Sequence, residues 1–159
     1  MVEILRAIGD WNPARVGGPA GERIVKRDVR HCMTIPARRC PPMVHDIPET
    51  ISIAAARIGK ELSELQISAT TIVKYASGGF YVDHTDSDPS STRLFSIVTY
   101  LNDDFIGGCT VFPRRGISLK PSPGQAILFP SDEIHRGETV LSGEKYIATN
   151  WLSRAPGAS

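Results

Sequence analysis

Short runs of strand-forming residues fill the chain from Gln66 onward, and they constrain the fold more than any other feature. The runs are rich in Val, Ile, Thr, Tyr and Phe and are interrupted by Gly, Pro, Asn and Asp, with no helical period. Such texture is typical of two facing antiparallel sheets of a jelly-roll kind. The predicted strands are ATTIVKY (69–75), GFYVDH (79–84), RLFSIVTYL (93–101), CTVFP (109–113), ISLKP (117–121), QAILFP (125–130), ETVL (138–141) and KYIATNWL (145–152).

One amphipathic helix is predicted ahead of these strands, which makes the expected fold mainly β with a flanking helix. Asp46 precedes Pro48 and Glu49, a pattern of a capping Asp, a first-turn proline and an acid three residues after the cap. Apolar residues then recur at steps of three or four, so one face of the helix should pack against an apolar surface. This stripe is Ile47, Ile51, Ala55, Ile58, Leu62 and Leu65.

Length, charge and cysteine content limit the classes of protein to which the chain can belong. A chain of 159 residues fits one domain, 1–159. The formal net charge of +1 predicts no general attraction to nucleic acid or membranes. Cys32, Cys40 and Cys109 are odd in number and form no CxxC pair, so neither a disulfide framework nor a cysteine zinc site is expected. With no export signal and no membrane span in the sequence, we expect a cytoplasmic protein.

The segment from Glu22 to Arg39 is rich in arginine and lysine. It could contact an acidic partner or form an ordinary solvated face. Because Glu22 and Asp28 are interleaved with the basic residues, the sequence favours the solvated face.

Three residues in the second half could hold a metal ion. His84 and Asp86 end a predicted strand two residues apart, a spacing that turns both side chains to one face. His135 follows the apolar run AILFP, which would carry it on a neighbouring strand. Two histidines and one carboxylate form a facial triad that leaves adjacent positions open on an octahedral iron(II) ion. An HxD motif also occurs by chance, and lone histidines are more often structural.

A lysine and a tyrosine strengthen the hypothesis of a binding site. Lys145 begins the last predicted strand, ten residues after His135, and a buried cation there can pair with a dicarboxylate. If the faces of 93–101 and 145–152 that carry Tyr100 and Lys145 both point inward, the two side chains converge.

The residues from Lys74 to Trp151 resemble the catalytic core of the prolyl 4-hydroxylase-like branch of the iron- and 2-oxoglutarate-dependent dioxygenases. The resemblance is carried, in order, by KYASGGFYVDHTD, RLFSIVTYLND with GGCTVFP, and PGQAILFPSDEIHRGETVLSGEKYIATNW. It implies a double-stranded β-helix of the cupin-like, jelly-roll kind, with a catalytic core at about 66–153. It also implies Fe(II), 2-oxoglutarate and O2 as cofactor and cosubstrates, with ascorbate as a supporting reductant.

The resemblance also implies residue roles. His84, Asp86 and His135 would be the catalytic iron ligands. Lys145 would bind the distal carboxylate of 2-oxoglutarate, with Tyr100 as its hydrogen-bond partner. Tyr75 would line the cosubstrate pocket. Tyr81 and Trp151 would line the substrate side, although all three aromatics also suit a plain core.

The implied reaction is hydroxylation of an unactivated C–H bond with release of succinate and CO2. Family resemblance favours a prolyl residue or a proline-like amino acid, in a peptide or a small molecule. Arg114, Arg115 and Arg136 are candidate anchors for a substrate carboxylate, or ordinary surface arginines.

Three alternatives stay open. The first is a hydroxylase of another free or carrier-linked amino acid or small metabolite. The second is a metal-binding jelly roll without catalysis, which would have no use for Lys145. The third is a nucleobase demethylase, which would need a basic groove with stacking aromatics that near-neutral charge and 7% aromatic content do not clearly supply.

Overall fold

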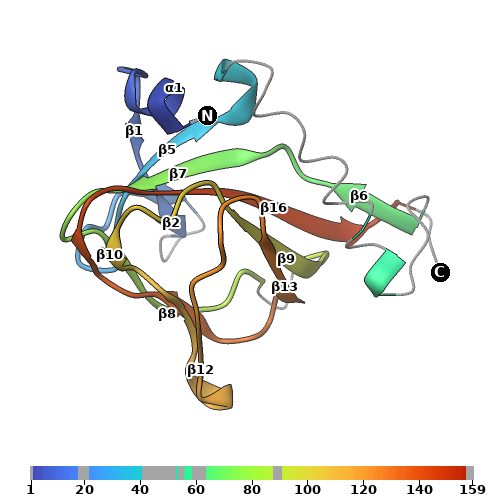
Figure 1. The fold of residues 1–159 in the computed structure, drawn as a ribbon. Helices are drawn as coiled ribbons and strands as arrows, with labels where there is room; N and C mark the ends of the chain where they lie inside the picture. The colour runs from blue at the N-terminus through green and yellow to red at the C-terminus, as the bar shows by residue number, and fades with distance from the viewer. Residues whose placement is uncertain are drawn as a thin grey trace.

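The computed structural model describes residues 2–17, 22–40, 53, 56–58, 64–87 and 91–156. Two β-sheets face each other, and short helix α1 lies on the outer side of the larger sheet (Figure 1). This arrangement is the double-stranded β-helix that the strand texture and the resemblance predict.

The larger sheet has the strand order β1-β5-β7-β16-β9-β13, with β6 also paired to β16. All its pairings are antiparallel. Its strands are β1 (Asn12–Pro13), β5 (Met33–Pro36), β6 (Leu65–Ile67), β7 (Thr71–Tyr75), β9 (Arg93–Tyr100), β13 (Ala126–Pro130) and β16 (Lys145–Arg154).

The smaller sheet has the order β12-β11-β14-β8-β4, and two short ribbons, β2–β3 and β10–β15, complete the β structure of the described residues. The remaining elements are α1 (Val2–Arg6), β2 (Val16–Gly17), β3 (Arg23–Ile24), β4 (Arg30–His31), η1 (Ala37–Arg39), β8 (Phe80–His84), β10 (Ile106–Gly107), β11 (Thr110–Phe112), η4 (Pro113–Arg115), β12 (Ile117–Leu119), β14 (His135–Gly137) and β15 (Val140–Ser142).

The larger sheet is buried on both faces, because successive residues of its central strands enter different cores. On β7, Ile72 packs into an outer core that includes Leu5 of α1, whereas Val73 packs into an inner core between the two sheets. On β16, Tyr146 and Ile147 divide in the same way. Burial on both faces explains why these strands read as nearly continuous apolar runs.

Only a small part of the predicted helix falls within the described residues. Most of the segment from Asp46 to Leu62 lies outside the described residues, while Ile58 packs against the outer core. The expectation that the helical stripe reaches Leu65 is wrong, because Leu65 begins β6 and pairs with Arg154 of β16. A β-branched and polar run follows Leu65, and pairing with a buried strand outweighs the helical period there.

All three cysteines are free thiols, with Cys32 and Cys40 buried. Across the described ranges, no helix combines the length and the apolar character needed to cross a bilayer.

Candidate active site

The two histidines face each other across paired strands of the smaller sheet. His84 ends β8 and is the direct antiparallel partner of His135, the first residue of β14. Their ring centroids lie 4.1 Å apart. The expectation that the run AILFP carries His135 is wrong, since that run is β13 of the larger sheet, whereas His135 lies on a separate strand of the smaller one.

Asp86 completes the cluster from a turn. β8 ends at His84, so strand alternation does not set the direction of Asp86. Instead the backbone N–H of Asp86 donates to the carbonyl oxygen of Ser131 at 2.8 Å, and Arg93 Nη1 donates to the carbonyl oxygen of Asp86 at 2.8 Å. The Asp86 carboxylate lies 3.6 Å from His84 Nε2 and 3.8 Å from His135 Nε2. One ligand atom from each residue lies within 4.8 Å of the others, a cluster that could hold a metal ion.

Backbone carbonyls orient both imidazoles. His84 Nδ1 lies 2.8 Å from the carbonyl oxygen of Val82, and His135 Nδ1 lies 3.0 Å from that of Glu133. When Nδ1 donates the hydrogen, Nε2 carries the free lone pair, as metal-binding histidines require. β8 therefore supplies both the His84 imidazole and its backbone acceptor, whereas the acceptor of His135 comes from the segment just before β14.

The protonation states of the cluster suit metal binding. Burial would raise the pKa of Asp86, but hydrogen bonding to His84, the charge of His135 and the Ser96 hydroxyl outweigh it, so the pKa lies below its ordinary value. Burial and the neighbouring His84 lower the pKa of His135. An ionised carboxylate and a neutral imidazole are the ligand forms that a divalent ion takes.

Two serines that the sequence analysis missed support Asp86. Ser96 of β9 donates its hydroxyl to Asp86 Oδ2 at 2.7 Å and lies 3.0 Å from the Ser131 hydroxyl. Ser96 and Ser131 are both fully buried. A polar residue on an otherwise apolar strand was the available signal, since Ser96 is the only small hydroxyl within the run LFSIV.

Lys145 is a buried cation at the opposite end of the same pocket. Its side chain is 2% exposed, and its Nζ donates to Tyr100 OH at 3.1 Å and to the carbonyl oxygen of Gly108 at 2.6 Å. Among the described residues no carboxylate forms an ion pair with it. Burial lowers the pKa of Lys145 to about 7. A buried ammonium without a carboxylate is costly, so this site is suited to an anionic ligand.

Gly108 and Tyr100, the two hydrogen-bond acceptors of Lys145, are themselves held in fixed positions. Gly107 and Gly108 both have positive φ, and an added Cβ at Gly107 would lie 2.6 Å from the carbonyl oxygen of Thr139. Tyr100 is fully buried, its hydroxyl lies 2.7 Å from Thr110 Oγ1, and burial raises its pKa to about 12. A neutral phenol can accept from Lys145 and still donate elsewhere.

One pocket joins the histidine cluster to Lys145. It is lined by Arg30, Tyr75, Tyr81, His84, Asp86, Val98, Thr110, His135, Arg136, Gly137, Lys145, Ile147, Thr149 and Trp151. The predicted inward face of the last strand is therefore realised, since alternate residues of β16 from Lys145 to Trp151 line this pocket.

The predicted aromatics lie at three different places in the pocket. Tyr75 is buried, with Lys145 Nζ 5.5 Å from its ring centroid. Tyr81 stacks on the ring of His84 with centroids 3.5 Å apart, so it lies on the metal side. Trp151 carries the guanidinium of Arg93 4.1 Å above its ring. Tyr100, in contrast, is not among the lining residues, and it accepts a hydrogen bond from Lys145, which is.

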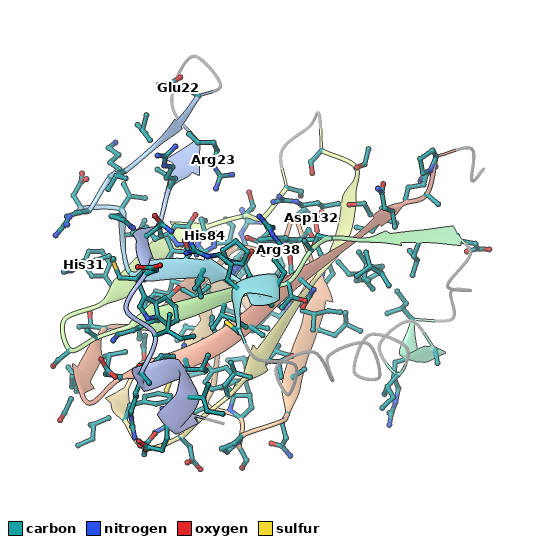
Figure 2. All side chains as sticks on the ribbon, turned by 90° about the horizontal axis from the view of Figure 1, so that it is seen from above. Glu22, Arg23, His31, Arg38, His84 and Asp132 are labelled. Carbon is teal, nitrogen blue, oxygen red and sulfur yellow. The ribbon has the colours of Figure 1, made fainter. Side chains whose placement is uncertain are left out.

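Of the three arginines proposed as substrate anchors, one lines the pocket and two do not. Arg136 lines the pocket, although it also lies 3.4 Å from Asp83 and 3.7 Å from Glu138. Arg115 pairs with Glu133 at 2.6 Å, outside the pocket lining. Arg114 is exposed on η4 and is not part of the lining either. Figure 2 shows His84 among the side chains of the described chain, with Arg23 on the hairpin above it in that view.

Known proteins match both the sequence and the fold. Prolyl 4-hydroxylase 1 of Arabidopsis thaliana is 31% identical over 160 residues, covering 80% of this chain and 55% of that protein. Prolyl 4-hydroxylase subunit alpha-1 of Gallus gallus is 31% identical over 116 residues, covering 58% of this chain and 22% of its own length. The chain thus spans about half or less of the length of these curated relatives.

Solved structures of lower identity share the fold. A Pseudomonas putida prolyl-4-hydroxylase aligns with a TM-score of 0.65 and 22% identity, over 80% of this chain and 74% of that one. A Trichoplax adhaerens prolyl hydroxylase, in complex with a hypoxia inducible factor peptide fragment, aligns with a TM-score of 0.72 and 14% identity, over 96% and 74%.

The family model of the 2OG-Fe(II) oxygenase superfamily matches residues 70–153, more than half of the chain, and includes the histidine cluster, Tyr100 and Lys145. The chain therefore belongs to the 2OG-Fe(II) oxygenase superfamily.

Proposed function

We propose that this protein is an Fe(II)- and 2-oxoglutarate-dependent hydroxylase, with His84, Asp86 and His135 as its iron ligands. The observation that carries the proposal is the arrangement of the pocket. A two-histidine, one-carboxylate cluster lies in it together with a buried lysine that has no carboxylate partner among the described residues.

The donor set fits iron(II). Two imidazoles and one carboxylate match the facial triad of non-haem iron oxygenases, which leaves positions free for a cosubstrate and O2. The Nδ1 atoms already have backbone partners, and Ser96 already bonds one carboxylate oxygen. The ligands are therefore pre-oriented by their neighbours.

Lys145 would bind the distal carboxylate of 2-oxoglutarate. Its ammonium has donors left after the bonds to Tyr100 and Gly108, and Thr110 and Tyr100 add hydroxyls beside it. A carboxylate there would give the ammonium the counter-charge that it lacks. Tyr75, whose ring lies below Lys145, would wall this end of the pocket.

With iron, 2-oxoglutarate and O2 bound, the site would supply an oxidant that inserts oxygen into a C–H bond, with release of succinate and CO2. The chain's own task is to hold one C–H bond near the cluster and to exclude water from it. Tyr81 and Trp151 would serve this task, because both line the pocket and Tyr81 stacks on the ring of His84.

A prolyl residue of a peptide is the proposed target. Both curated relatives described above are named prolyl 4-hydroxylases, and the Trichoplax adhaerens enzyme was solved with a peptide. A free or carrier-linked amino acid is the second candidate, supported by Arg136 in the pocket lining, which could hold a carboxylate.

The test is mass spectrometry of proline-containing peptides incubated with protein, Fe(II), ascorbate, 2-oxoglutarate and O2. The proposal predicts the mass gain of one oxygen atom on proline, absent without 2-oxoglutarate. Succinate formation stimulated by free amino acids and not by any peptide would favour the second candidate. Iron binding without 2-oxoglutarate binding would favour a non-catalytic metal-binding protein.

Replacing Ser96 by alanine is expected to weaken Fe(II) binding by about 10- to 100-fold, because Asp86 loses a hydroxyl that orients its carboxylate. Anaerobic Fe(II) titration would measure the change. The matched control is Ser118→Ala on β12, whose exposed side chain should leave the affinity unchanged. Equal affinities for wild type and Ser96→Ala would contradict the role.

Stability of the protein without cosubstrate is expected to rise with pH between about 7 and 10.5. The pKa of Lys145 is about 7 in the folded chain and 10.5 as its ordinary value. Between these values the unfolded chain binds more protons, so the free energy of unfolding increases with pH, by about 1.4 kcal/mol per pH unit at most. Urea unfolding at pH 7 and at pH 9 measures this change in the free energy of unfolding.

The Lys145→Met variant should lose this increment, and saturating 2-oxoglutarate should reduce it, because a bound carboxylate raises the pKa of the lysine again. An identical pH dependence in wild type and variant would show that Lys145 is charged throughout the range.

A further inference from the structure

A second, larger depression opens beside the catalytic pocket. It measures about 470 Å³, and Arg30, Thr149 and Trp151 line both. The groove therefore continues from the place where a reacting C–H bond would lie. Its lining is Asn12, Pro13, Arg15, Arg23, Arg30, Thr34, Ile35, Pro36, Thr71, Arg93, Thr149 and Trp151.

The groove concentrates positive charge. Four arginines line it, Arg15, Arg23, Arg30 and Arg93, and no aspartate or glutamate is among the lining residues. The whole chain has 18 basic and 17 acidic residues, so this excess is local. Among the described residues, none of the four forms an ion pair with a carboxylate, whereas Arg6, Arg39, Arg115 and Arg136 all do.

Two of these arginines are held in place by aromatic faces. The guanidinium of Arg30 lies 4.6 Å from the Tyr81 ring centroid, and its Nε donates to Cys32 Sγ at 3.2 Å. Arg93 lies over Trp151 and uses one donor on the carbonyl oxygen of Asp86. A guanidinium has five N–H donors, so both keep donors for an anion in a pre-organised geometry.

The other two arginines, Arg15 and Arg23, lie on the side of the groove next to the β2–β3 ribbon. Arg23 Nη2 donates to the carbonyl oxygen of Arg15 at 3.1 Å, and both side chains are exposed. Arg23 belongs to β3, the strand that projects from the body next to Glu22 (Figure 2). Arg15 and Arg23 form the outer pair of the groove. Arg30 and Arg93 form the inner pair, because Arg30 lines the catalytic pocket and Arg93 bonds to Asp86 of the histidine cluster.

Trp151 adds an unsatisfied donor. Its Nε1 is buried and has no hydrogen-bond partner among the described residues. A buried indole N–H normally finds an acceptor, and the described residues supply none to Trp151. The groove thus offers hydrogen-bond donors, hydroxyls and positive charge to an acceptor-rich ligand.

The number and spread of the arginines distinguish the possible occupants. A free amino acid has one carboxylate, and one arginine suffices for it. A nucleic acid would follow a basic track outside the groove as well, whereas Arg6, Arg39, Arg115 and Arg136, outside the groove lining, each pair with a carboxylate. A polypeptide with several carboxylates matches a confined groove with inner and outer arginines.

We propose that the arginine-lined groove binds an acidic polypeptide segment, so that preferred substrates carry aspartate or glutamate close to the residue that is hydroxylated. The inference rests on the proposed hydroxylase function and deepens it. It gives a specific role to two arginines of the basic segment, because Arg23 and Arg30 line the groove.

The test is binding of a fluorescent peptide, followed by anisotropy, to protein holding Fe(II) and 2-oxoglutarate without O2. One peptide has a central proline with glutamate at alternate positions, and its counterpart has glutamine at each of them. The glutamate peptide should bind about tenfold more tightly, and the ratio should fall at high salt. The variant Arg15→Gln/Arg23→Gln should lose most of this preference while binding the glutamine peptide as wild type does.

The matched control is Arg154→Gln, an exposed arginine at the end of β16 outside the groove lining, which should keep the full preference. Equal binding of the two peptides by wild type would overturn the proposal. So would tighter binding of single-stranded DNA of equal charge, which would make the groove a nucleic-acid site. Because binding is measured without turnover, succinate formation by the same protein after O2 is admitted tests the hydroxylase proposal independently.

Discussion

Replacing His135 by alanine is expected to abolish tight Fe(II) binding and to lower succinate formation by about 10³-fold or more. In the proposed site His135 supplies one of three ligand atoms, and among the described residues His84, Asp86 and His135 are the only such cluster, so no fourth residue of that cluster replaces it. Loss of metal chemistry worth several kcal/mol corresponds to a rate loss of this size. Anaerobic Fe(II) titration and a succinate assay measure the two effects.

The matched control is His31→Ala. His31 is an exposed histidine of β4 in the same sheet, outside the cluster, and lies well away from His84 in Figure 2. It should bind iron and turn over as the wild type does. Retained stoichiometric iron binding in His135→Ala, or an equal loss in both variants, would contradict the assignment of the ligands.

Replacing Lys145 by methionine is expected to raise the 2-oxoglutarate concentration needed for half-maximal succinate formation by about 10²-fold. Truncating one partner of a buried charge pair costs about 2–5 kcal/mol, which spans that factor. Iron binding should survive, because Lys145 is not part of the metal cluster. Calorimetric titration of 2-oxoglutarate into the Fe(II) protein measures the affinity directly.

The same change should leave the fold intact and increase its free energy of unfolding at pH 7 by about 1 kcal/mol or more. A methionine fills a similar volume without the cost of burying an ammonium group. The control is Lys120→Met, whose exposed lysine donates to the carbonyl oxygen of Phe105. Unchanged 2-oxoglutarate affinity in Lys145→Met would remove the lysine from the cosubstrate site.

The strands that carry the site could be predicted because burial makes them conspicuous. The run KYIATNWL became β16 and RLFSIVTYL became β9, the two most extensively paired strands of the larger sheet. The period-two alternation of a strand was then enough to predict that Lys145 and Tyr100 point inward, where Lys145 Nζ lies 3.1 Å from Tyr100 OH.

Several short elements were not predicted, for the opposite reason. β1 to β5 and β14 have two to four residues each, too few for any hydrophobic period, and long-range pairing stabilises them. His135 illustrates this, since its strand is recognisable only through its pairing with β8. Asp86 likewise lies beyond the strand that was expected to orient it, and the backbone of Ser131 holds it instead.

The groove was missed because it is assembled from distant parts of the chain. Arg15, Arg23, Arg30 and Arg93 are spread over many residues, and only the arrangement of β1, β3, β4 and β9 around one depression brings them together. Charge composition averages over the whole chain, and a net charge of +1 hides a local excess of this kind.

The most direct test of the proposed oxygenase is O2-dependent conversion of 2-oxoglutarate to succinate by purified protein loaded with Fe(II). We predict that succinate appears in step with the loss of 2-oxoglutarate, that it disappears under argon, and that Asp86→Ala abolishes it. A protein that binds one Fe(II) at the cluster and leaves 2-oxoglutarate unchanged in air, with or without prolyl peptides, would contradict the account.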